Sequence, residues 1–219
     1  MKKVICFSLW GDSPKYTVGA LKNIQLAKEI FPEWICRFYI GKSVPISIIE
    51  NIVKFDNTEI IIMNEPGDWT GMFWRFYAAS DQNVYAMISR DTDSRLTYRE
   101  KKAVDQWLAS EKDFHIMRDH PHHATEILGG MWGVKNNFLN NMKNLIQNYK
   151  KGDFWQVDQN FLKEIIYPIV KDNSCVHDEF FERKPFPIAR ENYEFVGQIF
   201  DENENTVLEH KEILKRVLG

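Results

Sequence analysis

Short apolar runs alternate with amphipathic helical patterns through the first half of the chain, and no other feature restricts the fold as strongly. Strands are predicted over residues 3–10, 35–40, 59–63 and 84–88. Helices are predicted at 46–55, at the aromatic segment 70–80, and before Pro32, where Ala20, Ile24, Ala27 and Phe31 share one face. Because parallel strands need such crossover helices, this order predicts a layered α/β fold with a mostly parallel central sheet flanked by helices.

The second half of the chain is less regular. The segment Thr97-Tyr98-Arg99-Glu100 has the form of a capping box and predicts the start of a helix. A strand is predicted at 114–117, a Gly-containing apolar segment follows at 127–134, and further helices are predicted at 136–149, 157–166 and 206–218. No internal repeat, low-complexity tract or linker is found, which predicts a single domain over residues 1–219.

The composition is that of an ordinary globular protein, with 44% hydrophobic and 27% charged residues. A formal net charge of −3 gives no reason to expect nucleic acid as a partner. Cys6, Cys36 and Cys175 form no Cys-x-x-Cys pair and are expected to be reduced, buried thiols. The first apolar run breaks at 11–14, too soon for a signal peptide or a membrane span, so we expect a cytoplasmic protein with no transmembrane segment.

Two carboxylates, Asp91 and Asp93, follow the apolar run 84–88 one residue apart. A strand that ends this way delivers both acids to the rim of the sheet where ligands bind in open α/β folds. Magnesium and manganese take carboxylate ligands together with substrate phosphates, so the pattern indicates a seat for a metal and a diphosphate. Arg90 and Arg95 flank it and could also approach phosphate oxygens. A solvated turn is the alternative interpretation of so short a pattern.

Several segments, taken in order, resemble GT-A-type glycosyltransferases. The first strand with its following loop, the helix that bears Arg75, and the segment 89–95 around the two aspartates have the family's arrangement. The segment 127–134 is similar to the family's Gly-containing strand beneath the donor sugar. Finally, 155–162 resembles the Asp-bearing start of a helix at the reaction centre, and 175–178 resembles the segment with a late metal-binding histidine. The match covers most of the chain, and its order and spacing are more specific than any single motif.

The resemblance implies a role for each of these residues. It implies a Mn²⁺ or Mg²⁺ ion held by Asp91, Asp93 and His177, with Asp91 also able to hold the ribose, and Asp158 as the general base of an inverting reaction. It places the donor nucleotide and its sugar against a further set of residues: Ser8, Leu9, Trp10, Arg75, Gly129 and Gly130.

Each role has a structural alternative. Without the family order His177 would be an ordinary surface or core histidine, and Asp158 an acid that interacts with a helix dipole. Arg75 would form a surface salt bridge, and Gly129 and Gly130 a bulge or turn. Aromatic residues that could offer apolar faces to sugar rings are more often part of the core, here Trp69, Trp74, Trp132 and Trp155. Trp10, which the resemblance places near the nucleotide base, has the same alternative. The cluster His120, His122 and His123 lacks a fourth ligand at zinc-site spacing and is expected to be a polar loop on the acceptor side.

The expected function is therefore metal-dependent transfer of a sugar, as a hexosyl- or deoxyhexosyltransferase. The donor would be a nucleoside-diphosphate sugar, with UDP favoured and GDP possible, and the acceptor a hydroxyl group of a glycan or another molecule.

Three other functions are weighed against this one. A haloacid-dehalogenase-type phosphohydrolase would carry its Asp-x-Asp after the first strand, where this chain has Ser8-Leu9-Trp10-Gly11. A nucleotidyltransferase that forms nucleotide sugars would carry a Gly-rich basic loop there, for which Gly11-Asp12-Ser13-Pro14-Lys15 is a poor substitute. A non-catalytic carbohydrate-binding protein on the same fold is disfavoured by the presence of all the predicted site acids.

Overall fold

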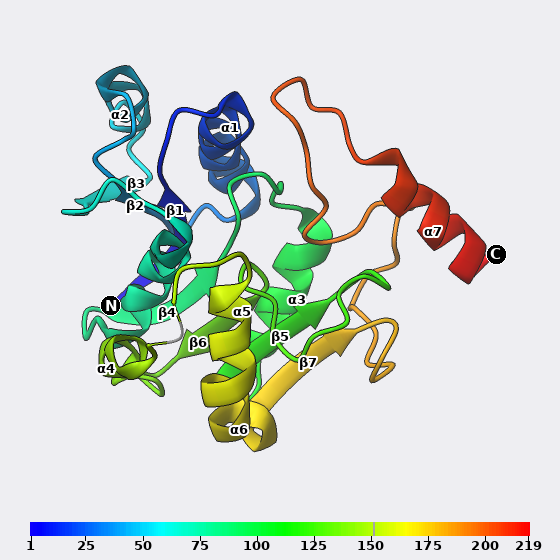
Figure 1. Ribbon diagram of the computed structural model, residues 1–219. Coiled ribbons are helices and arrows are strands. Elements are labelled where there is room, and N and C mark those ends of the chain that lie inside the picture. Colours follow the sequence, from blue (N-terminus) through cyan, green and yellow to red (C-terminus); the bar gives the residue numbers. More distant parts are fainter. Residues whose placement is uncertain (151) are drawn as a thin grey trace.

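The computed structural model describes residues 1–150 and 152–219, and its strands form one seven-stranded sheet (Figure 1). The order across the sheet is β3-β2-β1-β4-β6-β5-β7. All neighbouring strands pair in parallel except β6, which runs antiparallel to both β4 and β5. This confirms the predicted mostly parallel α/β sheet. The strand bounds are β1 Lys2–Leu9, β2 Ile35–Ile40, β3 Thr58–Ile62, β4 Val84–Ser89, β5 Phe114–Arg118, β6 Trp132–Lys135 and β7 Ser174–Asp178.

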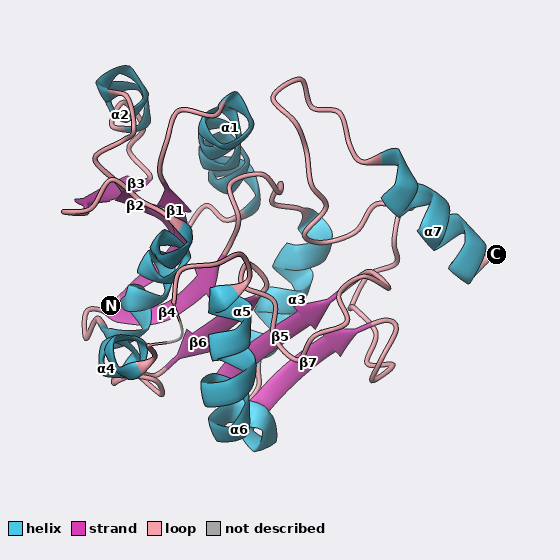
Figure 2. Cartoon of the chain, in the orientation of Figure 1, coloured by secondary structure: helices cyan, strands magenta, loops and turns pink. Residues whose placement is uncertain are grey.

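Helices cover both faces of the sheet and enclose a separate hydrophobic core on each side (Figure 2). One face carries α1 (Pro14–Ile30), α2 (Ile46–Ile52) and α3 (Tyr98–Ala109). The other carries the 3₁₀ helix η1 (Trp69–Ser80), α4 (Met142–Asn148), α5 (Val157–Phe161), the π-helical η2 (Leu162–Ile166) and α6 (Tyr167–Val170). The short 3₁₀ turn η3 (Lys171–Asn173) leads into β7, and α7 (Leu208–Leu218) closes the chain at one side of the molecule.

Strand β1 shows why apolar runs in this chain become central strands. Its side chains alternate between the two cores: Val4 and Cys6 pack on the face of η1, whereas Ile5, Phe7 and Leu9 pack on the face of α1. A strand buried on both sides reads as a continuous apolar run rather than as an alternating one. The run therefore predicted the strand, and the structure places it between β2 and β4.

Four elements differ from the expectations. The aromatic helix η1 has 3₁₀ rather than α geometry, which stacks residues three apart, and Phe73 and Phe76 make such a contact with ring centroids 6.0 Å apart. The helix expected at 136–149 is confined to α4, and the apolar segment 127–134 forms a strand only from Trp132 onward. The sequence analysis did not assign β7 as a strand, because its alternating Ser-Cys-Val-His-Asp pattern is short and weakly apolar.

The capping box at the start of α3 is only half formed. Thr97 accepts a hydrogen bond from the backbone N–H of Glu100 at 3.2 Å, as the motif requires. The Glu100 carboxylate is buried, however, and it pairs with the guanidinium of Arg90 instead of returning to Thr97. Arg90 is buried as well and is thereby committed to this ion pair. The expectation that Arg90 approaches phosphate oxygens therefore conflicts with its position.

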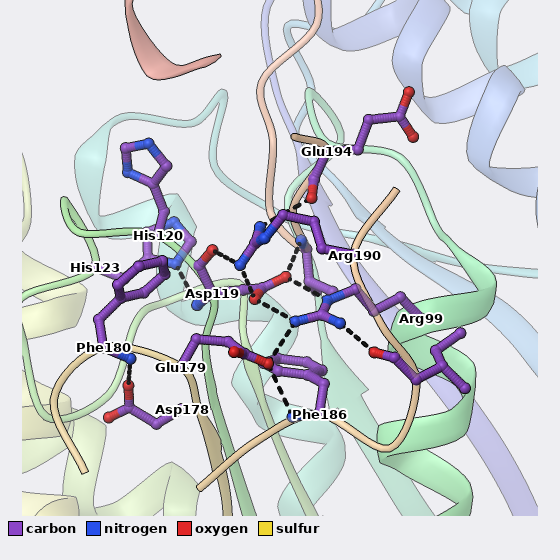
Figure 3. Close-up of polar contacts among 12 residues, drawn as sticks. Arg99, Asp119, His120, His123, Asp178, Glu179, Phe180, Phe186, Arg190 and Glu194 are labelled. Atoms are coloured by element: carbon purple, nitrogen blue, oxygen red, sulfur yellow. Dashed lines mark hydrogen bonds and ion pairs between the residues drawn. The ribbon is translucent and has the colours of Figure 1, made fainter. Parts of the chain in front are cut away.

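A buried ion-pair network fixes the segment after β7 to the sheet (Figure 3). Arg99 of α3 makes a bidentate contact with the Asp119 carboxylate, with both N–O distances at 2.9 Å, and also contacts Glu179 at 2.7 Å. Arg190 contacts the same Asp119 carboxylate at 2.7 Å, and the backbone N–H of Val196 donates to it at 2.9 Å. Asp119 is completely buried. One carboxylate thus ties α3 to two separate points of the C-terminal segment.

Within residues 1–150 and 152–219, none of the helices has the length and apolar character that crossing a membrane requires.

Candidate active site

The predicted aspartates Asp91 and Asp93 and the two predicted glycines meet at one rim of the sheet because of the direction of β6. Asp91 and Asp93 follow the end of β4, and Gly129 and Gly130 precede the start of β6. Since β6 runs antiparallel to β4, with Trp132 opposite Ser89, the start of one strand lies beside the end of the other. The Ser89 hydroxyl donates a 2.7 Å hydrogen bond to the Gly129 carbonyl and fixes the two segments together.

Arg75 of η1 connects the candidate metal-binding loop to the candidate base. Its guanidinium forms ion pairs with the carboxylates of Asp91 and Asp158, the latter at 3.0 Å, and its Nη1 donates to the Arg90 carbonyl at 3.2 Å. The backbone N–H of Arg75 donates to the Ser8 hydroxyl at 3.1 Å, which anchors η1 to the end of β1. Burial opposes the charge on this guanidinium, but the two carboxylates outweigh burial and raise the pKa of Arg75. The surface salt bridge considered as an alternative is therefore not what Arg75 forms, since its side chain is buried.

Asp158 lies in the first turn of α5 with its carboxylate enclosed by protein. Its residue exposure is 1%. Burial raises the pKa of Asp158 above its ordinary value, the charge of Asp91 raises it further, and the charge of Arg75 acts in the opposite direction. A carboxyl group with a raised pKa is better matched to proton transfer near neutral pH than an exposed aspartate is. Asp158 and Asp91, predicted from separate motifs, therefore converge on the same guanidinium.

The two adjacent glycines make room for these carboxylates. A Cβ atom on Gly129 would lie 2.3 Å from Oδ2 of Asp158, and one on Gly130 would lie 2.0 Å from Oδ2 of Asp91. Neither glycine has a positive φ, so what each position requires is the absence of a side chain rather than a special backbone conformation. The glycines thus let the backbone approach two carboxylates closely, whereas the predicted approach to a donor sugar stays a prediction.

We expect Gly129→Ala to cost more stability than Gly130→Ala, by roughly 1–3 kcal/mol in the free energy of unfolding. The added methyl group at position 129 meets the buried Asp158, which cannot move aside, whereas the Asp91 side chain is 47% exposed and can rotate toward solvent. Urea unfolding of both variants measures the difference. Equal costs, or a larger cost at position 130, would contradict this account of the glycines.

Asp93 has a partner that the sequence analysis did not assign. Nζ of Lys15, at the start of α1, lies 2.7 Å from Oδ2 of Asp93. Burial and the neighbouring Asp91 raise the pKa of Asp93, and Lys15 acts in the opposite direction. No sequence signal marked this contact, because it depends on strand order. The loop after β1 emerges at the same rim as the loop after β4, since the two strands are parallel neighbours, and Lys15 lies in the first turn of the helix that follows the loop after β1.

A divalent cation fits the chemistry of this pair of aspartates. Two carboxylates of one loop, one of them half exposed beside a glycine that leaves it space, are hard oxygen ligands of the kind that Mg²⁺ and Mn²⁺ use together with substrate phosphates and water. In the described part of the chain, no group of three or more His, Cys, Asp or Glu side chains is arranged to hold a metal ion by itself. Phosphate and water ligands would therefore have to complete the coordination.

His177 is not brought together with the aspartates. It lies on β7, where its Nδ1 is 2.8 Å from Nε2 of His115 and its Nε2 is 3.2 Å from Oε1 of Gln106. Burial and the charge of Arg99 lower the pKa of His177 to about 4. Both ring nitrogens have partners in the fold, and two strands, β6 and β5, separate β7 from β4 in the sheet order. Its predicted role as a metal ligand has no geometric support.

The remaining predicted donor contacts lie near the rim but differ in what they expose. The Leu9 side chain is in the core of the α1 face, so only its backbone is available to a ligand. The Trp10 ring packs edge-on against Trp74 at 6.1 Å. Trp74 and Trp132 are core residues, whereas Trp69 and Trp155 are 45% and 66% exposed.

Two histidines of the loop after β5, His120 and His123, contact the ring of Phe195 together with His210 of α7. The third, His122, contacts the rings of His120 and His210 instead. Nδ1 of His123 accepts a hydrogen bond from the backbone N–H of Asp119 at 3.0 Å, and the His120 ring contacts the His210 carbonyl at 3.0 Å. Burial lowers the pKa of His120 to about 4 and that of His123 to about 3. This cluster packs the loop against the C-terminal segment, near the network of Figure 3.

The comparisons with known proteins agree with this geometry at the level of the fold. The sequence matches no family model and no curated protein sequence. Among solved structures, the chain is similar to a glycosyltransferase involved in glycosylation of the major capsid of PBCV-1, with a TM-score of 0.55, 14% identity, and coverage of 83% of this chain and 84% of that one.

Two further solved structures have related folds. One is the mannosyltransferase PcManGT from Pyrobaculum calidifontis in complex with GDP-Man and Mn²⁺, with a TM-score of 0.54 and 12% identity; 84% of this chain covers 58% of that one. The other is the 4-diphosphocytidyl-2C-methyl-D-erythritol synthase from Anaerococcus prevotii DSM 20548, with a TM-score of 0.52, 8% identity, and coverage of 86% and 91%. At these identities the likeness shows the fold, which is that of GT-A-type glycosyltransferases, as the sequence resemblance predicted.

Proposed function

We propose that this chain is a metal-dependent glycosyltransferase that moves a sugar from a nucleoside-diphosphate sugar to a hydroxyl group of a glycan or another acceptor, with inversion at the anomeric carbon. The observation that carries the proposal is the convergence of Asp91 and Asp158 on Arg75 at the rim where β1, β4 and β6 meet. UDP and GDP are both candidate nucleotides, and the complex of a fold neighbour with GDP-Man and Mn²⁺ supports keeping GDP beside UDP.

In this proposal Asp91 and Asp93 hold the metal ion, and His177 is not among its ligands. A bound Mn²⁺ or Mg²⁺ would neutralise the negative charge that grows on the diphosphate leaving group. Arg75 pairs with Asp91 from the protein side, and its guanidinium is buried. Close backbone approach at Gly129 and Gly130 would let the donor sugar lie against the rim.

Proton transfer is assigned to Asp158. One carboxylate oxygen of Asp158 accepts the proton of the acceptor hydroxyl while the oxygen of that hydroxyl forms its bond to the anomeric carbon. The bond between the anomeric carbon and the diphosphate breaks at the same time, and its electron pair leaves with the nucleoside diphosphate. The raised pKa of Asp158, caused first by burial, favours its acceptance of this proton.

Thermal unfolding with MnCl₂ and a UDP- or GDP-sugar tests the metal assignment. We expect a rise in Tm of about 5–10 °C at a donor concentration 100 times its Kd, since ligand binding then adds about 2.7 kcal/mol. Asp93→Ala should lose this metal-dependent rise, because a charged oxygen ligand is removed. Asp105→Ala is the matched control, since Asp105 is a partly exposed aspartate paired with Lys101 on α3.

The outcomes separate the functions. A full donor-induced rise in Asp93→Ala would contradict the metal site. A rise in Tm caused by a free sugar, in the absence of metal and nucleotide, would favour a carbohydrate-binding protein on this fold. In that case neither the wild type nor Asp158→Asn would transfer sugar.

The contact between Lys15 and Asp93 keeps a second function in view, a nucleotidyltransferase that forms nucleotide sugars. Such an enzyme needs a basic group on the loop after the first strand, and Lys15 reaches the metal-binding aspartates from there. The fold neighbour that makes a diphosphocytidyl product is of similar TM-score to the glycosyltransferases. Release of pyrophosphate from CTP or UTP in the presence of sugar phosphates would identify this activity, whereas release of UDP or GDP from a nucleotide sugar identifies transfer.

A further inference from the structure

The ion pair between Lys15 and Asp93 places a protein cation on one of the two candidate metal ligands. Nζ of Lys15 lies 2.7 Å from Oδ2 of Asp93, a hydrogen-bonded distance. The Asp93 side chain is only 14% exposed, so an unpaired negative charge there would be poorly solvated. Lys15 thus neutralises a carboxylate that water reaches only in part.

The other candidate ligand is paired differently. Asp91 contacts Arg75, whose buried guanidinium is also held by Asp158 and by the Arg90 carbonyl. Arg75 therefore cannot withdraw without breaking several buried contacts. Lys15 has a single ion-pair partner among the described residues, a side chain that is 32% exposed, and a flexible four-carbon stem. Of the two cations at the aspartates, only Lys15 is free to move away.

We propose that Lys15 competes with the divalent metal for Asp93, so that the metal and the nucleoside diphosphate bind together rather than in sequence. The inference rests on the proposed function and adds a regulatory property to the same site. It makes Lys15 a positioning residue, because it acts on the metal through Asp93.

The electrostatics of the site explain why the two ligands depend on each other. A metal ion that arrives alone must displace Lys15 from Asp93. The ammonium group of Lys15 is then left beside the metal dication and is repelled by it. A diphosphate supplies phosphate oxygens with which the displaced ammonium can pair. Each ligand therefore raises the affinity for the other, and this coupling is reciprocal by thermodynamic necessity.

Mn²⁺ binding measured by electron paramagnetic resonance of the free ion tests the competition without any turnover. Titrations are made with and without a saturating nucleoside diphosphate, UDP or GDP, on the wild type and on Lys15→Met. We expect Lys15→Met to bind Mn²⁺ alone at least about fivefold more tightly than the wild type, the lower end of common coupling factors. The enhancement of Mn²⁺ affinity by the diphosphate should shrink by at least the same factor.

Two matched variants separate competition from a general charge effect. Lys15→Arg keeps a cation that can reach Asp93 and should behave like the wild type. Lys22→Met removes one positive charge from an exposed position of the same helix and should also leave the Mn²⁺ affinity unchanged.

Equal or weaker Mn²⁺ binding in Lys15→Met would overturn the competition, and so would an unchanged enhancement by the diphosphate. If metal-dependent stabilisation by a donor sugar persists in that case, the proposed function stands and only the role of Lys15 falls. If neither protein binds Mn²⁺ with or without a diphosphate, both the competition and the metal assignment are overturned.

Discussion

Replacing Asp158 by asparagine should abolish sugar transfer while leaving donor binding intact. The amide has nearly the same shape as the carboxylate but cannot accept the proton of the acceptor hydroxyl, and removal of a positioned acid–base group costs on the order of 10²–10⁴-fold in rate. The buried Arg75 keeps its ion pair with Asp91, so the rim should not lose its arrangement. Transfer is measured by release of UDP or GDP, and donor binding by the metal-dependent rise in Tm.

The matched control is Asp153→Asn, an exposed aspartate in the segment before α5. It should transfer sugar at the wild-type rate. Near wild-type transfer by Asp158→Asn would refute the general base and favour a retaining mechanism or another proton acceptor. Loss of donor binding in Asp158→Asn would instead place this carboxylate in the donor pocket.

The largest loss of stability is expected from Asp119→Asn. This carboxylate is fully buried and neutralises two arginines, Arg99 and Arg190, so an amide at this position leaves an excess of buried positive charge. Breaking a buried ion pair by removal of one partner typically costs about 3–5 kcal/mol, which for a domain of this size lowers Tm by roughly 6–20 °C.

Asp105→Asn breaks a partly exposed ion pair with Lys101 on the surface of α3 and is the control, with an expected cost of about 0–1 kcal/mol. Urea unfolding of both variants gives the comparison. A cost for Asp119→Asn as small as that of the control would mean that the C-terminal segment is held by packing rather than by this network.

Local patterns were sufficient to predict most of the sheet. The strand β2 has the predicted bounds, and β4 ends one residue beyond its predicted end, because apolar runs between loop signals mark strands that are buried on both sides. Elements whose form depends on distant contacts were not predicted. The strand β7 forms by pairing with β5, whose residues lie sixty positions earlier in the chain. Glu100 pairs with the buried Arg90 instead of completing the cap of its own helix.

In the candidate site, too, residues in local motifs could be predicted, whereas contacts between distant segments could not. The position of Asp91 and Asp93 at a strand end follows from the sequence pattern, and the resemblance to a known family singled out Arg75, Gly129, Gly130 and Asp158. Contacts across the rim, such as that of Lys15 with Asp93, depend on strand order, which a single sequence does not specify. The place of His177 among the predicted ligands came from the order of motifs alone, and in the fold this residue pairs with His115 instead.

The reversed direction of β6 makes the site sensitive to chain length at one particular place. The pairing of Ser89 with Trp132 sets how far Gly130 lies from Asp91, and a residue inserted between Gly130 and Trp132 would move both glycines along the rim and turn alternate side chains to the opposite face. An insertion near the exposed Ala124, in the connection from β5, changes the length of a loop without changing that register. The residues from Gly129 to Trp132 must therefore keep their spacing, whereas the exposed position 124 is not tied to that register.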